Sequence, residues 1–374
     1  MNCNEEKTVV ILADYAAEYK GNFLTSLFNL ENKLKSENIS IVYIFPEKAK
    51  KREWIPEMED TGKIILFMSG KLWDDISVIR QVIKNFNPAI CHVHFSGRIS
   101  RQIFFRLFSF GKIKIIRHWH STVTKLSTGW KKVLKIYLLR FKYGFVSFHC
   151  GCGKAVYEDM LLYFNRKKCG YITNCIDFLR LNSMPNGNGK KDYGFEKNIV
   201  CMMFASFFFV KGCDIAIEAI MQIHEKYKIK LILICSKKAS SDVFENIVKI
   251  CGNKPDWIAI VPTREDIRYY YNMSDIVLSP SRYEGFAYVL PEAVYCEALP
   301  IRSDLSALDH GHEKEFVVPV GDVNALRRAI IDVISLPREK KTEIIKKQRD
   351  LVVVNFPIEK WSNEIVTLYK NFIR

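Results

Sequence analysis

Short apolar runs rich in β-branched residues recur along the chain and alternate with stretches of helical periodicity. They lie at residues 8–12, 39–45, 63–68, 89–94, 114–118 and 145–150, and then at 198–205, 230–235, 257–261, 275–279 and 316–318. Their apolarity is continuous rather than alternating, which is typical of strands buried on both faces of a parallel sheet. Alternation of such strands with helices gives right-handed βαβ units, so the predicted fold class is α/β with Rossmann-like doubly wound sheets.

The chain is long enough for two such domains. It has 374 residues, and a domain takes roughly 100–200. Residues 182–198 are rich in polar and turn-forming residues and lack an apolar period, so we expect the interdomain linker there. The prediction is an N-terminal domain over 1–181 and a C-terminal domain over 182–356, facing each other across a cleft. Ligands of such sheets bind beyond the carboxyl ends of the strands.

A terminal helix is predicted over residues 357–374. Pro357 suits the first helical position. An apolar stripe then recurs at helical spacing, formed by Trp361, Ile365, Leu368 and Phe372. Such a stripe must be buried, and we expect it to pack back on the N-terminal domain.

Cysteine usage and hydropathy bear on the compartment. The eleven cysteines form no pairing framework, so we interpret them as free thiols in a reducing compartment. The sequence has neither the pattern of a signal peptide nor a run of about 18 apolar residues. We therefore expect a cytoplasmic protein, soluble or peripheral on the inner face of the cell membrane.

The net charge of +15 favours an anionic partner such as a phosphorylated substrate or anionic lipid, although a well-solvated lysine-rich surface accounts for it equally well. No nucleic-acid recognition motif or arginine-rich run accompanies the charge, so nucleic acid is discounted. The segment 130–145 is both basic and apolar. One interpretation is a helix lying on an anionic membrane, and the other is a core helix whose lysine stems snorkel.

Two glutamates follow the predicted strand 275–279. Glu284 stands in a loop directly before Gly285, and Glu292 lies seven intervening residues further on. A helix is predicted to begin near Ala287 or Tyr288, which places Glu292 in its first turns. The unpaired N–H groups of that helix start would form an anion site suited to a diphosphate.

This pair resembles the Glu-x7-Glu signature of retaining family-4 glycosyltransferases, which are GT-B enzymes of the glycosyl transferases group 1. Other pieces resemble the family in the same order: the segment 208–214 resembles a Lys-Gly-x-Asp turn, 174–177 an Asn-Gly-Ile-Asp segment, and 316–326 a Val-Pro-x-Gly-Asp segment. The resemblance covers nearly the whole chain and implies the GT-B fold.

The resemblance also implies roles for the donor-side residues. Glu284 would contact hydroxyls of the donor sugar and Glu292 the ribose hydroxyls, since a carboxylate accepts two hydrogen bonds from a diol. Backbone N–H groups of Gly285, Phe286 and Ala287 would hold sugar or phosphate. On the residues alone, a surface acidic pair is the alternative.

Lys211 would neutralise the departing diphosphate, with a solvated loop lysine as the alternative. The family usually carries an arginine where this chain has Ser206, so one cation of the expected pair is missing. Arg282 and Arg264 are candidates to replace it.

Two histidines end the predicted strand 114–118. The resemblance implies a histidine here that faces the donor sugar; His120 matches best by position and His118 is the rival. A structural, hydrogen-bonded histidine is the alternative for each. Gly21 opens a helical pattern after the first strand, as in the family's first glycine loop, although a plain strand–helix turn fits equally well.

The predicted function is transfer of a hexose-type sugar from a nucleoside diphosphate sugar, expected to be a UDP-sugar, to a glycan or lipid-linked acceptor. The resemblance implies retention of configuration, a role in polysaccharide, capsule or cell-envelope biosynthesis, and no required cofactor or bound metal. Two alternatives stay open: a nucleotide-sugar epimerase on the same fold, and a non-catalytic partner subunit of a glycosyltransferase. The substitution at Ser206 is the feature that favours the second.

Overall fold

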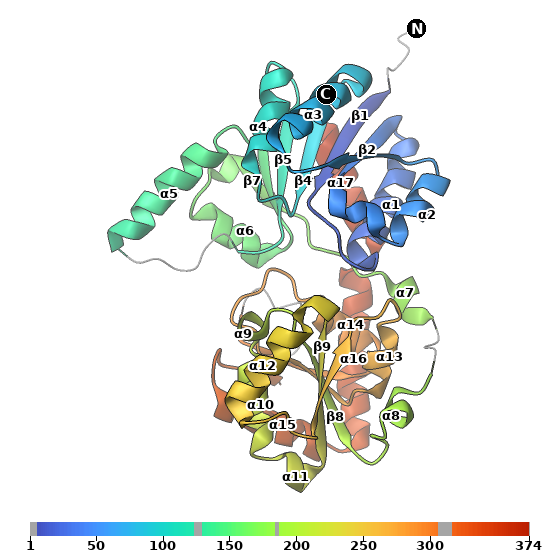
Figure 1. Cartoon of the computed structure of the whole chain (residues 1–374), viewed down its shortest axis with the longest axis vertical. Coiled ribbons are helices and arrows are strands. Elements are labelled where there is room, and N and C mark those ends of the chain that lie inside the picture. Colours follow the sequence, from blue (N-terminus) through green and yellow to red (C-terminus); the bar gives the residue numbers. More distant parts are fainter. Residues whose placement is uncertain (1–5, 123–128, 184–186, 306–315, 374) are drawn as a thin grey trace. The chain divides into compact units, whose positions relative to one another are not determined.

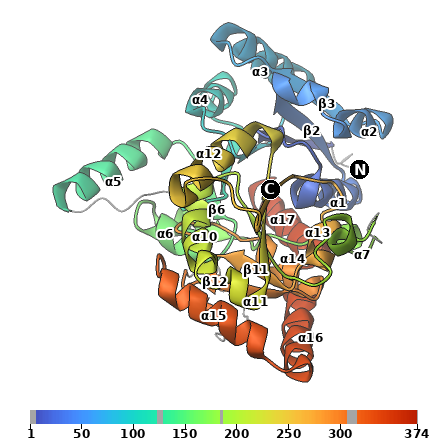
Figure 2. The ribbon, with the colours of Figure 1, turned by 60° about the horizontal axis from the view of Figure 1, so that its bottom comes forward.

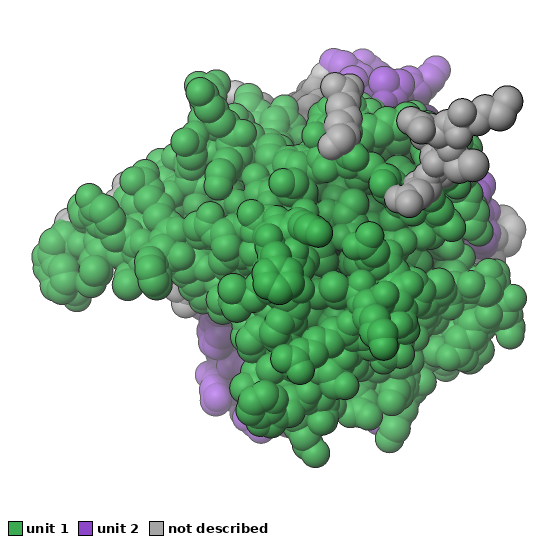
Figure 3. Space-filling model, turned by 90° about the horizontal axis from the view of Figure 1, so that it is seen from above, with its two compact units in different colours: residues 1–175, 358–374 green, residues 176–357 purple. Residues whose placement is uncertain are grey.

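The computed structural model describes residues 6–122, 129–183, 187–305 and 316–373. The chain divides into two compact units (Figures 1 and 3). The first unit is Met1–Cys175 with Ile358–Arg374, and the second is Ile176–Pro357. Each has its own parallel sheet and its own core.

The first unit is built on a seven-stranded sheet of order β3-β2-β1-β4-β5-β6-β7. Every strand pair is parallel. The strands are β1 (Lys7–Ala13), β2 (Ile39–Pro46), β3 (Ile64–Met68), β4 (Ile90–His94), β5 (Lys114–Trp119), β6 (Phe148–Gly151) and β7 (Cys169–Tyr171). The helices are α1 (Gly21–Lys35), α2 (Trp54–Asp60), α3 (Leu72–Phe86), α4 (Ile99–Phe108), α5 (Gly129–Tyr143), α6 (Lys154–Leu161) and α17 (Ile358–Ile373).

The second unit is built on a six-stranded sheet of order β10-β9-β8-β11-β12-β13, again all parallel. The strands are β8 (Ile199–Phe204), β9 (Ile229–Cys235), β10 (Ile258–Pro262), β11 (Ile276–Ser279), β12 (Leu299–Ser303) and β13 (Val317–Val318). The helices are α7 (Phe178–Asn182), α8 (Gly189–Asp192), α9 (Phe208–Lys211), α10 (Cys213–Met221), α11 (His224–Tyr227), α12 (Ser240–Cys251), α13 (Arg268–Met273), α14 (Val289–Tyr295), α15 (Val323–Ser335) and α16 (Arg338–Asn355).

Continuous burial of the strands explains both sheets. In β1 every residue after Lys7 is buried, and in β9 every residue is buried except the half-buried Lys230. Such strands need helices on both faces, which right-handed crossovers provide. The strand order reverses beside β1 in the first unit and beside β8 in the second, as in doubly wound folds. The predicted fold class is therefore confirmed at the level of two Rossmann-like parallel-sheet units.

Two strands were not anticipated from the sequence. β7 has three residues, too few to show a pattern. β12 contains Pro300, which normally argues against an inner strand because proline cannot donate to a ladder. Here β13 pairs with β12 only at Arg302 and Ser303. Pro300 therefore has no β13 residue opposite it, and its missing N–H costs no ladder hydrogen bond to that strand.

The chain passes between the units twice, at Cys175–Ile176 and at Pro357–Ile358. The expected boundary after residue 181 falls inside α7, and the expected linker 182–198 lies in the second unit, where it includes α8. The terminal helix α17 belongs to the first unit and packs against α1. Its residues Trp361, Ile365 and Tyr369 join the core of that unit.

Histidines interrupt the apolar layer between the first sheet and α17. His92 and His94 on β4 and His118 on β5 are each no more than 3% exposed. Nδ1 of His92 lies 2.7 Å from the Tyr369 hydroxyl, and Nδ1 of His118 lies 3.2 Å from Nε2 of His92. Burial lowers the pKa of all three imidazoles and takes that of His118 to about 3, so the cluster is neutral in the folded unit.

Within the described residues, no helix combines the length and apolarity needed to cross a membrane. The ten cysteines that the structure describes carry free thiols, and nine of them are buried.

The histidine cluster predicts a loss of stability in mild acid. The unfolded chain binds a proton at His118 near its ordinary pKa, whereas the folded unit does not until about pH 3. The stability that the neutral residue contributes is therefore complete above about pH 6.5 and declines as the pH falls towards 3. One such histidine lowers the free energy of unfolding by about 2 kcal/mol between pH 7 and pH 5.

Urea unfolding at both pH values, followed by circular dichroism, measures this difference. In His118→Gln, we expect the difference in the free energy of unfolding between pH 7 and pH 5 to be about 2 kcal/mol smaller than in the wild type. It should be unchanged in His224→Gln, which alters a second-unit histidine stacked on Trp257. An equal pH dependence in wild type and His118→Gln would contradict the account.

Candidate functional site

A close backbone approach brings two segments of the second unit together. Gly212 joins α9 to α10 with a φ of +73°, and a Cβ there would lie 2.1 Å from the carbonyl oxygen of Pro280 in the loop after β11. Only glycine fits both the dihedral angle and the space. Nearby, the Arg282 N–H donates to the carbonyl oxygen of Val210 at 2.8 Å. The loops that follow β8 and β11 are thus held against each other.

This approach places Lys211 beside Glu284. Lys211 Nζ lies 2.6 Å from Glu284 Oε2, and the two side chains are 27% and 12% exposed. The predicted loop lysine and the first predicted glutamate therefore form an ion pair, although they are far apart in sequence. At this separation and partial burial, the pair is electrostatically stronger than one in open water.

A pocket of about 360 Å³ opens over this ion pair at the carboxyl ends of β8 and β11. Six of the sequence-predicted residues line it: Ser206, Lys211, Glu284, Phe286, Ala287 and Glu292. Other lining residues are Phe204, Phe207, Ser279, Ser281, Tyr288 and Val289. The pocket thus combines apolar walls, hydroxyls, two carboxylates and an amine, as small-molecule sites commonly do.

Glu292 is buried in the wall of the pocket and held by two side chains that the sequence did not identify. Its Oε2 accepts a hydrogen bond from the Tyr271 hydroxyl at 2.7 Å, and its Oε1 accepts one from Arg180. Tyr271 is fully buried, and burial together with the carboxylate raises its pKa far above the ordinary value. The phenol therefore stays protonated and remains a donor to Glu292. Arg180 lies on α7, so no local spacing marks it.

The loop before α14 offers backbone donors. α14 begins at Val289, one to two residues after the predicted start. Among the described residues, none accepts a hydrogen bond from the N–H of Gly285 or Ala287. Phe286 packs its buried ring against Tyr288 and Phe356, with centroids 4.9 and 5.7 Å apart. The ring anchors the loop, and as far as the described residues go, the two N–H groups are open to an anion or to a hydroxyl oxygen.

The two candidate arginines for the cation missing at Ser206 have partners outside the pocket. Arg282 forms a two-pronged ion pair with Asp214, at 2.8 and 2.7 Å, and this hydrogen bonding raises its pKa. Arg264 lies over the ring of Tyr269, 4.0 Å from its centroid, and neither arginine lines the pocket. The Ser206 hydroxyl instead accepts the backbone N–H of Ser236 at 3.2 Å. Lys211 is the cation among the described lining residues.

The first unit gathers its own candidates at the carboxyl ends of β1, β4 and β5. Gly21 starts α1 with a φ of +56°, and Phe23 in the same turn lies 6.2 Å from the His120 ring, centroid to centroid. His120 stacks on Phe95 at 3.8 Å, and its Nε2 lies 3.1 Å from Nδ1 of His94. Burial, reinforced by neighbouring histidines, lowers the pKa of His120 well below 6.5, so this imidazole is neutral. Such a neutral imidazole is able to accept a hydrogen bond from a hydroxyl or to donate one.

His118 lies deeper than His120. It is 3% exposed and hydrogen-bonded to His92, whereas His120 is partly exposed. The ligand atoms of His92, His94 and His118 lie within 4.8 Å of one another, a spacing that a metal ion could bridge. The hydrogen bonds among the rings and to Tyr369 already use most of these nitrogens, so the cluster is explained as a polar part of the core.

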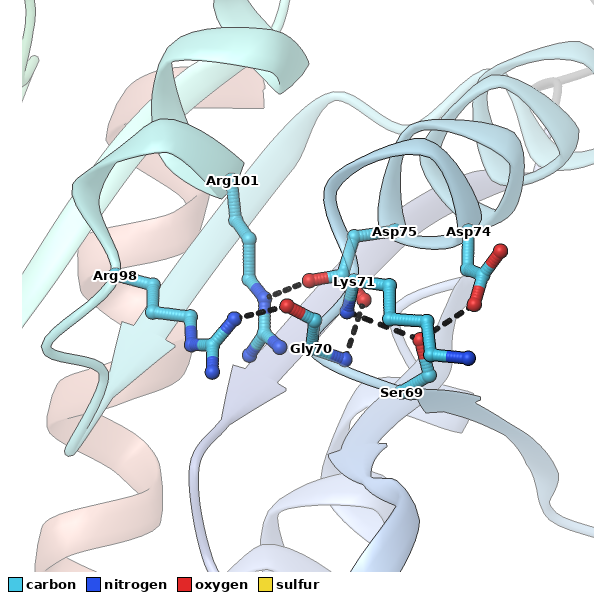
Figure 4. Close-up of polar contacts among 7 residues, drawn as sticks. All are labelled: Ser69, Gly70, Lys71, Asp74, Asp75, Arg98 and Arg101. Carbon is cyan, nitrogen blue, oxygen red and sulfur yellow. Dashed lines mark hydrogen bonds and ion pairs between the residues drawn. The ribbon is translucent and has the colours of Figure 1, made fainter.

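A buried ion pair fixes the neighbouring edge of the first unit. Figure 4 shows Asp75 on α3 and Arg101 on α4 pointing toward each other. Arg101 Nε lies 2.8 Å from Asp75 Oδ2. Asp75 also accepts the N–H of Gly70 at 3.0 Å, and Arg98 donates to the Gly70 carbonyl. These contacts tie the loop between β3 and α3 to the start of α4.

Part of the chain resembles known proteins in sequence. Residues 188–351 match the family model described as Glycosyl transferases group 1, a stretch that contains Lys211, Glu284 and Glu292. A curated relative, the tRNA-queuosine alpha-mannosyltransferase of Drosophila melanogaster, is 25% identical over 162 residues. That match spans 42% of this chain and 41% of the relative's length.

Solved structures share the fold along the whole chain. A glycosyltransferase from Rickettsia africae superposes with a TM-score of 0.76 at 16% identity, covering 99% of both chains. Anabaena HepE in complex with UDP-glucose superposes with a TM-score of 0.76 at 14% identity, covering 97% of this chain and 99% of that one. Two Rossmann-like units in this order are typical of the GT-B fold, which confirms the predicted fold class.

The contact between Gly212 and Pro280 predicts a specific steric effect. Alanine in a left-handed conformation costs about 1 kcal/mol, and the overlap with the Pro280 carbonyl adds to this, so we expect Gly212→Ala to destabilise the second unit by about 2–4 kcal/mol. The matched control is Gly252→Ala, where φ is +79° and no atom lies within 4 Å of the added Cβ. It should cost only about 1 kcal/mol. Urea unfolding of both variants measures the difference, and equal losses would contradict the steric argument.

Proposed function

We propose that this protein is a retaining hexosyltransferase of the family-4 type, which takes its sugar from a UDP-sugar. The observation that carries the proposal is the 2.6 Å contact between Lys211 and Glu284 at the base of one pocket, inside the stretch matched by the group 1 family model. Solved GT-B neighbours hold UDP and UDP-glucose, which supports a UDP-sugar as the donor.

In this proposal the ion pair separates as the donor binds. Lys211 turns its ammonium to the diphosphate and stabilises the charge that develops on the leaving UDP. Glu284, released from the lysine, accepts hydrogen bonds from hydroxyls of the transferred sugar. The N–H groups of Gly285 and Ala287 donate to the same ligand. Because Lys211 supplies positive charge at the diphosphate, the proposed reaction needs no bound metal.

Glu292 is proposed to bind the ribose diol. Tyr271 and Arg180 orient the carboxylate, and each carboxylate oxygen has a second lone pair that can accept from a hydroxyl. The Glu292 carboxylate is thus held in the orientation for ribose binding before the donor arrives.

In the first unit, His120 is proposed as the residue that contacts a sugar hydroxyl. A neutral imidazole stacked on Phe95 is suited to hydrogen-bond a sugar hydroxyl. Retention would follow if the acceptor attacks the face from which UDP leaves, with the departing phosphate taking the acceptor proton.

A glycan or lipid-linked acceptor of polysaccharide or cell-envelope biosynthesis is proposed from the surface of α5. Figures 1 and 2 show this helix projecting from the first unit. Large apolar side chains recur along one face at helical spacing and are strongly exposed: Trp130 71%, Leu134 49%, Tyr137 66% and Phe141 90%. Lys131, Lys135 and Lys142 flank this stripe. Such a helix is suited to lie at an anionic membrane surface, and the alternative of a core helix does not explain the exposure.

A tRNA acceptor is the second candidate. It is favoured by the name of the curated relative, which acts on queuosine in tRNA, and the net charge of +15 is compatible with it. Parallel assays with tRNA and with a lipid extract as acceptor discriminate the two. Release of a converted donor without acceptor would instead favour an epimerase, and absence of binding to any nucleotide or nucleotide sugar would favour a non-catalytic partner subunit.

The ion pair predicts the effects of two substitutions. Glu284→Ala should nearly abolish transfer from a UDP-sugar, followed as UDP release, because the sugar hydroxyls lose their acceptor. Lys211→Ala should weaken UDP binding about tenfold or more, since a charge-assisted contact to phosphate is lost. Isothermal titration calorimetry measures the affinity.

The matched control is Lys190→Ala. Lys190 is also 27% exposed and lies 2.7 Å from its carboxylate partner, Asp275, outside the pocket. We expect unchanged UDP affinity in this variant. Wild-type turnover in folded Glu284→Ala would remove the central assignment.

The α5 stripe predicts membrane binding through specific aromatic residues. The double variant Trp130→Ser/Phe141→Ser should lose about tenfold or more in partition to anionic vesicles, because two exposed aromatic rings no longer enter the interface. The matched control is Trp73→Ser/Phe110→Ser, which removes aromatic side chains that are 78% and 92% exposed elsewhere on the first unit. Vesicle co-sedimentation measures the partition, and equal behaviour of the two double variants would contradict the assignment.

A further inference from the structure

A second pocket of about 450 Å³ lies in the first unit at the carboxyl-terminal end of α5. Val146 and Lys168 in its wall precede β6 and β7, so it opens at the amino ends of these strands. His120 follows the carboxyl end of β5 and is at the opposite edge of the sheet. The proposed transfer reaction therefore does not use this pocket. Its wall includes Arg140, Tyr143, His149, Phe164, Asn165 and Lys168.

The charge of this pocket is positive. None of its described lining residues is acidic. Arg140 Nε donates to the carbonyl of Tyr163 at 2.9 Å, and Lys168 Nζ lies 3.5 Å from the carbonyl of Val146. These contacts hold both cations at the wall, yet neither forms an ion pair with a carboxylate that the structure describes. Two anchored and uncompensated cations favour an anionic ligand.

A buried arginine stands behind the wall and adds to the same field. Arg117 is 9% exposed, and its guanidinium lies 4.8 Å from the ring centroid of Tyr143. It donates to the carbonyl of Ser96, but its Nε and Nη1 have no partner among the described residues. A buried cation without a carboxylate is costly, and an anion bound in the adjoining pocket would offset that cost.

His149 gives the pocket a neutral donor. It is 2% exposed and stacks on Phe164 with centroids 3.9 Å apart. Its Nδ1 accepts a hydrogen bond from Trp119 Nε1 at 3.2 Å, so the proton of the neutral ring is on Nε2. Burial, with Arg117 and Lys168 nearby, lowers the pKa of His149 to about 3. Histidine, arginine and lysine thus all present N–H donors, which match the acceptor oxygens of a phosphate.

The pocket adjoins the apolar stripe of α5. Arg140 and Tyr143 come from the last turn of that helix, and Phe141 between them is 90% exposed. A ligand that carries an anionic group and hydrocarbon chains satisfies both features, because its phosphate fits the donors and its chains cover the stripe. Charge complementarity selects an anion, and the exposed apolar stripe favours a membrane lipid over a free phosphate, which would leave the stripe uncovered.

We propose that this pocket binds the phosphate headgroup of an anionic membrane lipid and so anchors α5 on the membrane. The inference rests on the membrane contact proposed above and adds a specific headgroup site to it. It is independent of the donor pocket, because no residue of that pocket takes part.

The first measurement uses the full chain and glycerol phosphate as a soluble probe. We expect saturable shifts of the His149 ring resonances in NMR spectra, and about tenfold weaker binding in Arg140→Gln and in Lys168→Gln. The second uses vesicles of phosphatidylglycerol and phosphatidylcholine against phosphatidylcholine alone. Loss of one ordinary charge near an anionic surface lowers partition about fivefold, as expected for the control Lys131→Gln. The double variant Arg140→Gln/Lys168→Gln should lose at least about a hundredfold in partition.

Three results would overturn the proposal: no saturable shift at His149, glycerol phosphate binding without binding to phosphatidylglycerol vesicles, or a loss per charge in the pocket variants no larger than in Lys131→Gln. Calorimetry with UDP on the same variants separates this inference from the proposed function. Arg140 and Lys168 do not line the donor pocket, so UDP affinity should be intact in these variants. If the donor assignment is wrong, the wild-type protein will not bind UDP in the same calorimetry.

Discussion

The pocket of the second unit depends on one close contact between two loops. Gly212 turns the chain with a positive φ where its Cα faces the carbonyl of Pro280, and this lets the loops after β8 and β11 meet. Lys211 and Glu284, brought from distant parts of the chain, then lie 2.6 Å apart at the base of one pocket. The ion pair keeps a charged amine and a carboxylate in place before any ligand arrives. A larger residue at position 212 would push the two loops apart and so separate Lys211 from Glu284.

Much of the fold could be predicted from the sequence, because strands buried on both faces appear as continuous apolar runs. Prediction failed where that signal was absent. β7 has three residues, and β12 contains Pro300, whose missing N–H is harmless only because β13 pairs further along. The unit boundary was also displaced. Turn-forming residues at 182–198 indicate surface loops, but the second unit begins at Ile176, where no such composition marks the change.

The candidate site shows the same limit. Lys211, Glu284 and Glu292 could be chosen from motif spacing, and the structure gathers them in one pocket. Tyr271 and Arg180, which hold Glu292, were missed because their relation to it exists only after folding. The question of which arginine replaces the cation lost at Ser206 also needed coordinates. Arg282 is bound to Asp214 and Arg264 lies on Tyr269, so Lys211 is the cation among the described lining residues.

The central claim is that a nucleotide diphosphate binds against Lys211. Lysine acylation followed by mass spectrometry, with and without saturating UDP, tests it most directly. We predict that UDP strongly slows the labelling of Lys211 but leaves Lys190 unaffected, although both side chains are 27% exposed and paired with a carboxylate. Equal labelling of Lys211 in the presence of UDP, at concentrations that saturate the protein, would contradict the account.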